Sequence, residues 1–161
     1  MGGQPLDDLP VAAQPAGDGL QTTAMIGAMT PVPALRHPCP PGACICERER
    51  LLALPDADLR ILRLTRDEEK RLIDRLENFA SLAELERLQQ RMLEQLGLRV
   101  QVRPGANEVR TMRGIHISLD ELPGMCRKTR QAIPAAIRRG LEKRPEIAFE
   151  LLNAHDLLRD A

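Results

Sequence analysis

The sequence contains no tryptophan, no tyrosine and only two phenylalanines, Phe79 and Phe149, among its 161 residues. A hydrophobic core must therefore be built from Leu, Ile, Val, Met and Ala. Unbranched and γ-branched side chains keep more rotamer freedom in a helix than aromatic ones, so the composition favours helices. The scarcity of aromatic rings also argues against a platform that stacks the bases of single-stranded nucleic acid.

Long apolar runs are absent as well. No stretch approaches the ~20 apolar residues of a membrane-spanning helix. The first residues, MGGQPLDDLP, carry Asp7 and Asp8 where a secretory signal would carry Lys or Arg. We therefore expect a cytoplasmic protein that does not bind a membrane. Thiols stay reduced in the cytoplasm, so clustered cysteines there indicate metal binding or redox chemistry rather than structural disulfides.

Catalytic motifs are missing too. The sequence has no phosphate-binding loop and no dinucleotide-binding glycine pattern. His116 and His155 have no nucleophile beside them in the sequence, and the carboxylates resemble ordinary helix-surface charge. Whether the protein is an enzyme stays uncertain at this point, and a non-catalytic role is favoured.

The net charge is zero, but the charges are unevenly distributed. Residues 99–144 carry eleven Lys and Arg against four Asp and Glu, a net charge of +7. Such asymmetry bears on partners rather than on the fold. We expect this segment to contact nucleic acid or an acidic protein, unless it is a solvated face that pairs with the acidic segments beside it. The candidate anion-binding residues are Arg99, Arg103, Arg110, Arg113, Arg127, Lys128, Arg130, Arg138 and Arg139.

The chain divides into three segments by composition. Residues 1–35 are rich in Pro and Gly and lack a periodic apolar pattern, which predicts a disordered tail. Residues 36–50 form a cysteine loop. Residues 51–161 are expected to fold as a single α+β domain, mainly helical, with a helical hairpin, a small antiparallel sheet and C-terminal helices.

The helical hairpin rests on two capping boxes. Residues 65–68 (Thr-Arg-Asp-Glu) and 81–84 (Ser-Leu-Ala-Glu) each predict a helix start, and Gly97 is a suitable C-cap for the second helix. Two helices joined by so few residues should pack antiparallel. A shorter helix is expected over 47–54, whereas 59–64 is ambiguous between a strand and an extended lead-in.

The apolar period then changes from helical to alternating. Residues 98–102, 108–112 and 115–119 predict two or three antiparallel strands, with a turn at 104–107. Two helices follow, over 129–143 and 146–158. Proline disfavours a helix interior, so we expect the first of these helices to start at Pro134, after a separate turn at 125–131.

Three of the four cysteines lie within eight residues, with the spacing C-x4-C-x-C: Cys39, Cys44 and Cys46. The surrounding prolines and Gly42 keep this loop out of a helix and allow several thiolates to converge. Thiolates select zinc, Cu(I) or iron–sulfur clusters, and a closed site takes four ligands. We prefer Cys126 as the fourth ligand, with His37 as the alternative. The spacing differs by one residue from that of plant-type ferredoxins, so no family is assigned.

Other interpretations of the cysteines remain open. The loop thiols could form a redox or regulatory set, or bind nothing. Cys126 has cationic neighbours, so it could instead be a reactive thiol or a small buried residue. Residues 124–129 also resemble, faintly, the turn of a helix-turn-helix, although Pro134 falls where the recognition helix should be continuous.

The leading hypothesis is a small cytoplasmic, non-catalytic metal-binding protein, with zinc or an iron–sulfur cluster, a basic interaction surface and a regulatory role. The first alternative is a nucleic-acid-binding regulator that needs no metal. The second is a protein-interaction adaptor that uses the Leu-rich face of residues 82–96. At that spacing the leucines are more typical of a buried core.

Overall fold

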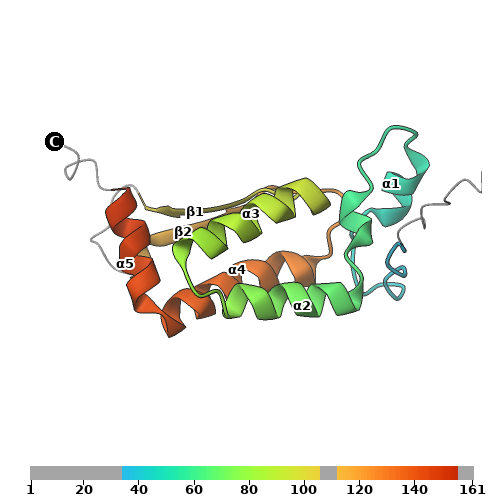
Figure 1. Cartoon of the computed structure of the whole chain (residues 1–161). Coiled ribbons are helices and arrows are strands. Elements are labelled where there is room, and N and C mark those ends of the chain that lie inside the picture. Colours follow the sequence, from blue (N-terminus) through green and yellow to red (C-terminus); the bar gives the residue numbers. More distant parts are fainter. Residues whose placement is uncertain (1–33, 106–111, 156–161) are drawn as a thin grey trace, which may run out of the picture. The chain divides into compact units, whose positions relative to one another are not determined.

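The computed structural model describes residues 34–105 and 112–155, all within the second of two compact units, Val32–Ala161. The tail predicted over 1–35 lies outside the described residues except for its last two. The helices are α1 (Arg48–Ala53), α2 (Arg66–Glu77), α3 (Leu82–Leu96), α4 (Arg127–Lys143) and α5 (Pro145–Ala154). The strands are β1 (Val100–Pro104) and β2 (Ile115–Leu119), and the short 3-10 turns are η1 (Arg60–Arg63) and η2 (Met112–Gly114). This arrangement confirms the mainly helical α+β class (Figure 1).

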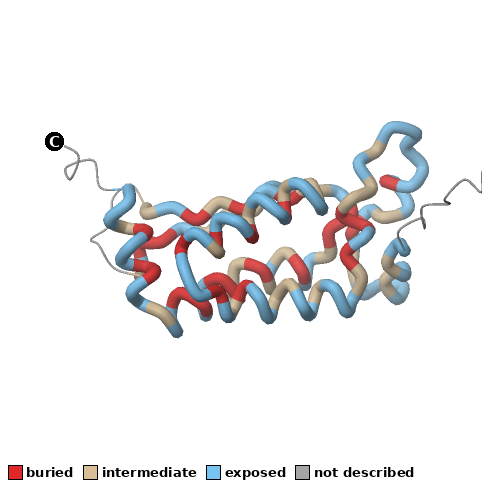
Figure 2. The backbone as a smooth tube through the Cα atoms, in the orientation of Figure 1, coloured by how far each residue is buried: buried red, intermediate tan, exposed pale blue. Residues whose placement is uncertain are grey.

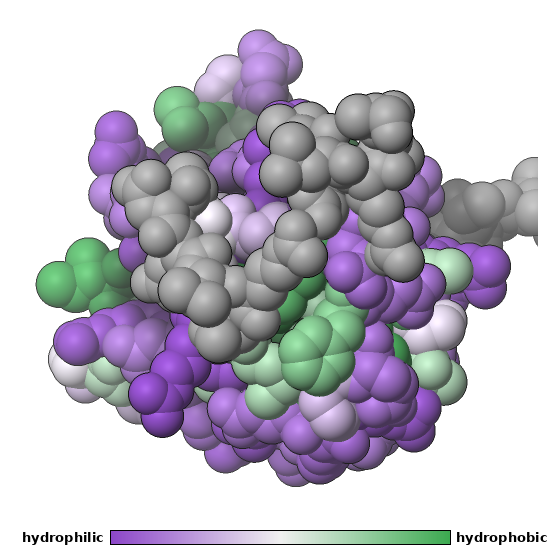
Figure 3. Space-filling view, turned by 90° about the vertical axis from the view of Figure 1, so that its left-hand side faces the viewer, coloured by the Kyte–Doolittle hydropathy of each residue, from purple (hydrophilic) through white to green (hydrophobic). Residues whose placement is uncertain are grey.

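The described elements pack around one hydrophobic core. Helix α2 lies along α4, whereas α3 lies against η1 and β1, and α5 contacts α4 and β1 (Figure 1). Buried stretches face one another between the elements, and exposed stretches lie on the outside (Figure 2). Core residues come from η1, both strands and α1 to α5. The view onto the α5 end shows a mostly hydrophilic surface with smaller hydrophobic areas (Figure 3).

Both helices start where the sequence predicts, but only the first has a full capping box, because the Glu84 side chain accepts from the Ala80 N–H and not from the Ser81 N–H. The Thr65 N–H donates to Glu68 Oε2 at 3.0 Å, and the Glu68 N–H donates to Thr65 Oγ1 at 3.4 Å. At α3 the Glu84 N–H donates to Ser81 Oγ at 3.2 Å. Gly97 ends α3 with a left-handed φ of 69°. The chain reverses direction between α2 and α3, as expected for a helical hairpin. However, α2 packs mainly on α4 and makes little contact with α3.

Gly140 explains the close approach of α2 and α4. A Cβ atom at this position would lie 2.5 Å from Phe79 Cε1 and 2.8 Å from the Leu76 carbonyl oxygen. The C-terminal ends of both helices meet here, since the Arg139 Nε donates to Glu77 Oε1 at 2.8 Å and the Lys143 Nζ lies 3.7 Å from Glu77. The two helices therefore run in parallel, with cations of α4 beside the negative end of α2.

The sheet has two antiparallel strands among the described residues. Val100 pairs with Leu119 and Val102 with Ile117, so these apolar side chains share one face. Arg103 pairs with His116 on the other face, as the alternation predicts. Of the strand predicted over 108–112, only Met112 is described, and it lies in η2.

Two local predictions are wrong. Residues 60–63 form a 3-10 turn that buries Ile61 and Leu62, and not a strand or an extended lead-in. Pro134 lies inside α4 and does not start it. An interior proline costs about 3 kcal/mol, but each fully buried isoleucine contributes about 1.5–3 kcal/mol. Ile133 and Ile137 lie on either side of Pro134 and are both fully buried, so packing outweighs the lost hydrogen bond.

Candidate metal centre

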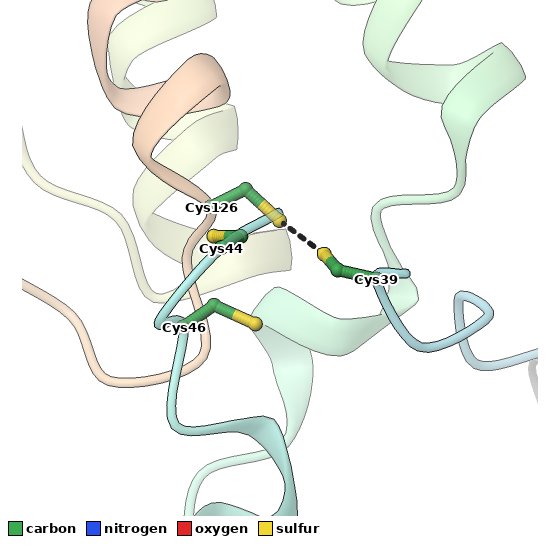
Figure 4. A group of neighbouring side chains, drawn as sticks. All are labelled: Cys39, Cys44, Cys46 and Cys126. Carbon is green, nitrogen blue, oxygen red and sulfur yellow. Dashed lines mark hydrogen bonds between the residues drawn. The ribbon is translucent and has the colours of Figure 1, made fainter. Parts of the chain in front are cut away.

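The structure brings all four cysteines together. The Sγ atoms of Cys39, Cys44, Cys46 and Cys126 lie within 4.8 Å of one another (Figure 4). The Sγ atoms of Cys39 and Cys126 are 3.3 Å apart, and all four thiols are free. Three of them come from the loop before α1, and Cys126 is the N-cap residue of α4. The four cysteines are therefore placed so that they could hold a metal ion.

A tight turn brings Cys39 back towards Cys44. The Ala43 N–H donates to the Pro40 carbonyl at 3.1 Å, and Gly42 has a left-handed φ of 78°. Beyond the turn, Cys44 and Cys46 both direct their sulfurs to the site, whereas the side chain between them, Ile45, is 97% exposed. In extended chain, alternate side chains point the same way, which accounts for the C-x-C spacing.

Gly124 joins the loop to the segment before α4. Its N–H donates to the Cys46 carbonyl at 2.8 Å, and its φ is 90°. A Cβ atom here would lie 2.7 Å from Leu51 Cδ2 and 3.0 Å from Ile61 Cγ2. Glycine therefore allows this segment to lie against the loop, and Cys126 follows two residues later.

Arg36 ties the other side of the loop to the domain. Its N–H donates to the Leu62 carbonyl at 2.8 Å, and its Nη2 donates to the Gly124 carbonyl. The guanidinium thus lies close enough to Cys46 and Cys126 to favour their thiolates. An arginine in this place offsets part of the negative charge that several thiolates would carry.

The pKa values of Cys39, Cys46 and Cys126 are shifted in different directions. Burial raises the pKa of Cys46, but the Arg48 N–H, the Arg36 charge and hydrogen bonds from Cys39 and Cys44 together lower it below its usual range. Burial, then the hydrogen bond with Cys39, raises the pKa of Cys126. The hydrogen bond with Cys126 lowers the pKa of Cys39, but burial and the negative charge of neighbouring thiolates raise it overall. If all four thiols were deprotonated, their mutual repulsion would be relieved by a bound cation.

The alternative fourth ligand, His37, is exposed and is not one of the residues that gather at the sulfurs. The geometry therefore favours Cys126 over His37 as the partner of the three loop cysteines. Sequence reasoning missed Arg36 and Gly124. For Gly124 a signal was present, because the Pro-Gly pair at 123–124 marks a turn just before Cys126.

The candidate anion-binding residues are spread over several places. Arg113 and Arg138 line one small hollow, and Arg99 and Arg103 line another, between α3 and β1. Three of the set lie beside carboxylates: Arg99 is 4.0 Å from Asp120, Arg130 is 3.6 Å from Glu121, and Arg139 pairs with Glu77. Arg127 and Lys128 are exposed at the start of α4, and Arg110 lies outside the described residues. Nucleic-acid binding by this set stays a prediction.

Two other sequence interpretations meet a structural obstacle. The resemblance to a helix-turn-helix fails because the element before Gly124 is the strand β2, not a helix. The Leu-rich face of α3 is mostly core, since Leu82, Leu85, Leu88 and Met92 are buried. A partner could therefore reach that face only where its edge stays open.

Comparison with known proteins gives no match, whether with family models, with curated proteins or with solved structures. Among the described helices, none has both the length and the apolar character needed to cross a membrane. What this protein binds is therefore inferred from the geometry of the cysteine site.

Proposed function

We propose that this chain binds one zinc ion through Cys39, Cys44, Cys46 and Cys126. The observation that carries the proposal is the mutual approach of the four Sγ atoms to within 4.8 Å. A zinc ion surrounded by four thiolates at about 2.3 Å holds neighbouring sulfurs about 3.8 Å apart. Only small side-chain movements would convert the observed arrangement into that tetrahedron.

An iron–sulfur cluster fits this spacing less well. In such a cluster the four thiolates are divided among two or four iron atoms that sulfides bridge, so thiolates on different irons stand further apart than around a single ion. Here all four Sγ atoms, including that of the remote Cys126, lie within one short distance of each other. A single tetrahedral ion is therefore the simplest occupant.

The proposed role of the site is structural. Four protein ligands close the coordination sphere and leave no position for a substrate or a catalytic water. The ion would cross-link the loop before α1 to the N-cap residue of α4, which lies 80 positions beyond Cys46 in the chain. Such a link would hold the loop in the folded state without chemistry of its own, in keeping with a non-catalytic metal-binding protein.

The first test is an ultraviolet–visible spectrum of protein purified without oxygen, with elemental analysis of the same sample. We expect colourless protein with one zinc per chain. Brown protein with iron and sulfide would show an iron–sulfur cluster instead. Red protein with one iron per chain would show that the four cysteines bind a single iron ion and not zinc. Metal-free protein that is folded and stable would overturn the proposal.

The ligand set is tested by substitution. Cys126→Ser should lower the zinc content well below one per chain, because three ligands remain. His37→Ala is the matched control from the same loop and should keep one zinc. If Cys126→Ser keeps its zinc while C39S, C44S and C46S each lose it, Cys126 is not a ligand and His37 takes its place.

A further inference from the structure

A trough of about 770 Å³ runs between α2 and α3, and no cysteine lines it. Positions 68, 71, 72 and 75 of α2 and positions 88, 91, 92 and 95 of α3 face it. Each set follows the spacing i, i+3, i+4, i+7, so each helix presents one continuous stripe to the trough. The trough is therefore bounded by two facing helical surfaces.

The trough exists because the two helices pack on different partners. Helix α2 lies along α4, whereas α3 lies against η1 and β1. Their mutual backbone contact is slight by comparison, so the space between their outer edges stays open. A third helix laid between two such helices would meet side chains from both.

The floor of the trough is apolar. Leu88 and Met92 are buried beneath it, with 7% and 2% of their surface exposed. Leu72 and Leu96 are partly buried and pack on the core from the trough side. An occupant would therefore bury part of Leu72 and Leu96, which favours a ligand with an apolar ridge.

The rim is basic. Four exposed arginines line it: Arg63, Arg71, Arg75 and Arg91. None of them has an ion-pair partner among the residues that the structure describes. Of the two carboxylates that line the trough, Glu68 accepts the Thr65 N–H of the capping box and Glu94 accepts from Gln90 Nε2 at 2.7 Å. The arginines are thus available to an external anion.

We propose that this trough binds an acidic amphipathic helix of a partner protein. An amphipathic helix lays its apolar ridge into a hydrophobic groove, with residues spaced i, i+3, i+4 and i+7. Acidic residues beside that ridge would meet the arginines, whose planar guanidinium binds a carboxylate through two parallel hydrogen bonds. A nucleic-acid backbone fits less well, because it has no apolar ridge to bury against Leu72 and Leu96 on the floor of the trough.

The test uses the full-length protein and a fluorescent synthetic peptide of about 18 residues, with Leu at i, i+4, i+7 and i+11 and Glu beside them. Fluorescence anisotropy should show saturable binding that weakens as salt rises from about 50 to 200 mM. A control peptide of the same composition, with its leucines dispersed around the helix, should bind far less. Equal binding of both peptides would overturn the proposal, because charge alone would then explain it.

Two double variants test whether the peptide binds in the trough. R71Q/R91Q should weaken binding about three- to tenfold, since each exposed charge pair contributes about 0.2–1 kcal/mol. K70Q/R87Q removes the same charge from exposed positions of the same two helices outside the trough, and should change binding less than about twofold. Equal weakening by both double variants would contradict the site.

Other occupants give different results. Tighter binding of a duplex oligonucleotide than of the peptide, lost in R71Q/R91Q, would replace the helix with a nucleic acid. Self-association that disappears in R71Q/R91Q would make a second copy of the chain the occupant. Either outcome overturns the proposal, and neither bears on zinc, because the trough contains none of the four cysteines.

Discussion

At the scale of single residues, the geometry of the cysteine site depends on Gly124. This glycine has a φ of 90°, donates its N–H to the Cys46 carbonyl and leaves no room for a Cβ beside Leu51 and Ile61. It therefore sets where Cys126 lies, although it offers no ligand atom. If the cysteines bind a metal ion, Gly124 supports the position of one ligand, and replacing such supporting residues weakens metal binding.

Gly124→Ala should weaken the proposed zinc binding about 10- to 100-fold, the range found when residues that support metal ligands are replaced. The added methyl group would push residues 122–126 away from the loop and misplace Cys126. Competition with a chromophoric chelator measures the affinity.

Gly42→Ala is the matched control for that experiment. Gly42 also has a left-handed φ, of 78°, but a Cβ there would meet nothing within 4 Å. Its replacement introduces only backbone strain of about 1–2 kcal/mol. An equal loss of affinity in both variants would attribute the effect to strain and would contradict the role of the close contacts at Gly124.

At the scale of elements, the packing of α2 on α4 is the main helix contact, and Gly140 makes it close. Gly140→Ala is informative because two effects oppose each other. Alanine is about 1 kcal/mol better than glycine inside a helix. Overpacking a tight core contact costs about 1–3 kcal/mol, and here the Cβ would meet the Leu76 carbonyl as well as the Phe79 ring.

We therefore expect Gly140→Ala to lower the free energy of unfolding, as measured by urea denaturation. Glu142→Ala serves as the control because it is an exposed replacement in the same helix and should change stability little. A more stable Gly140→Ala variant would mean that α2 and α4 move apart at little cost to accommodate the methyl group. The close packing of the two helices would then not depend on a glycine at position 140.

The same interface contains an ion pair that responds to pH. The hydrogen bond from Arg139, helped by the charge of Lys143, lowers the pKa of Glu77. A lowered pKa gives stability that is present above the unfolded value of about 4.3 and is lost as the pH falls through the folded value. Glu77→Gln should thus lower the melting temperature at pH 7, and the difference from the native chain should shrink as the pH falls below about 4.3.

Glu86→Gln, an exposed change on α3, is the control for that pH series and should show no such pH-dependent difference. A Glu77→Gln deficit that persists unchanged at low pH would mean that lost packing, and not the ion pair, is responsible.

At the scale of the whole described unit, the cysteine site lies where η1, the loop before α1 and the start of α4 meet (Figures 1 and 4). The α2–α4 interface at Phe79 and Gly140 is at the other end of α4. The hydrophobic core extends through both regions. A zinc ion at the cysteines should therefore stabilise the region around the cysteine site more than the α2–α4 interface at Phe79 and Gly140.

If the cysteines hold zinc as proposed, its removal should raise hydrogen exchange locally. The Gly124 and Arg36 amides, which bond to the Cys46 and Leu62 carbonyls, should exchange faster in chelator-treated protein. The amides of residues 136–141 should keep their protection, because buried apolar packing holds them. Uniform loss of protection across the chain would show instead that the metal is needed for the whole fold.

Much of the architecture follows from short-range patterns in the sequence. The two capping boxes, the Gly97 C-cap and the alternation at 98–102 and 115–119 each depend on hydrogen bonds or side-chain directions within a few residues. Such patterns can be recognised without knowing what packs against them. The clustering of Cys39, Cys44 and Cys46 is local in the same sense.

Tertiary structure decided the features that depend on distant contacts. Helix α4 continues past Pro134 because Ile133 and Ile137 are buried in the core. Residues 60–63 form a 3-10 turn because that conformation buries Ile61 and Leu62. Cys126 was a candidate fourth ligand from its residue type alone, yet its place beside the loop depends on Gly124 and Arg36. Local hydrogen bonds determine where each helix or strand forms. The free energy gained by burying apolar side chains between distant segments determines how these elements pack. That free energy depends on all the packed segments together, so no single stretch of sequence predicts it.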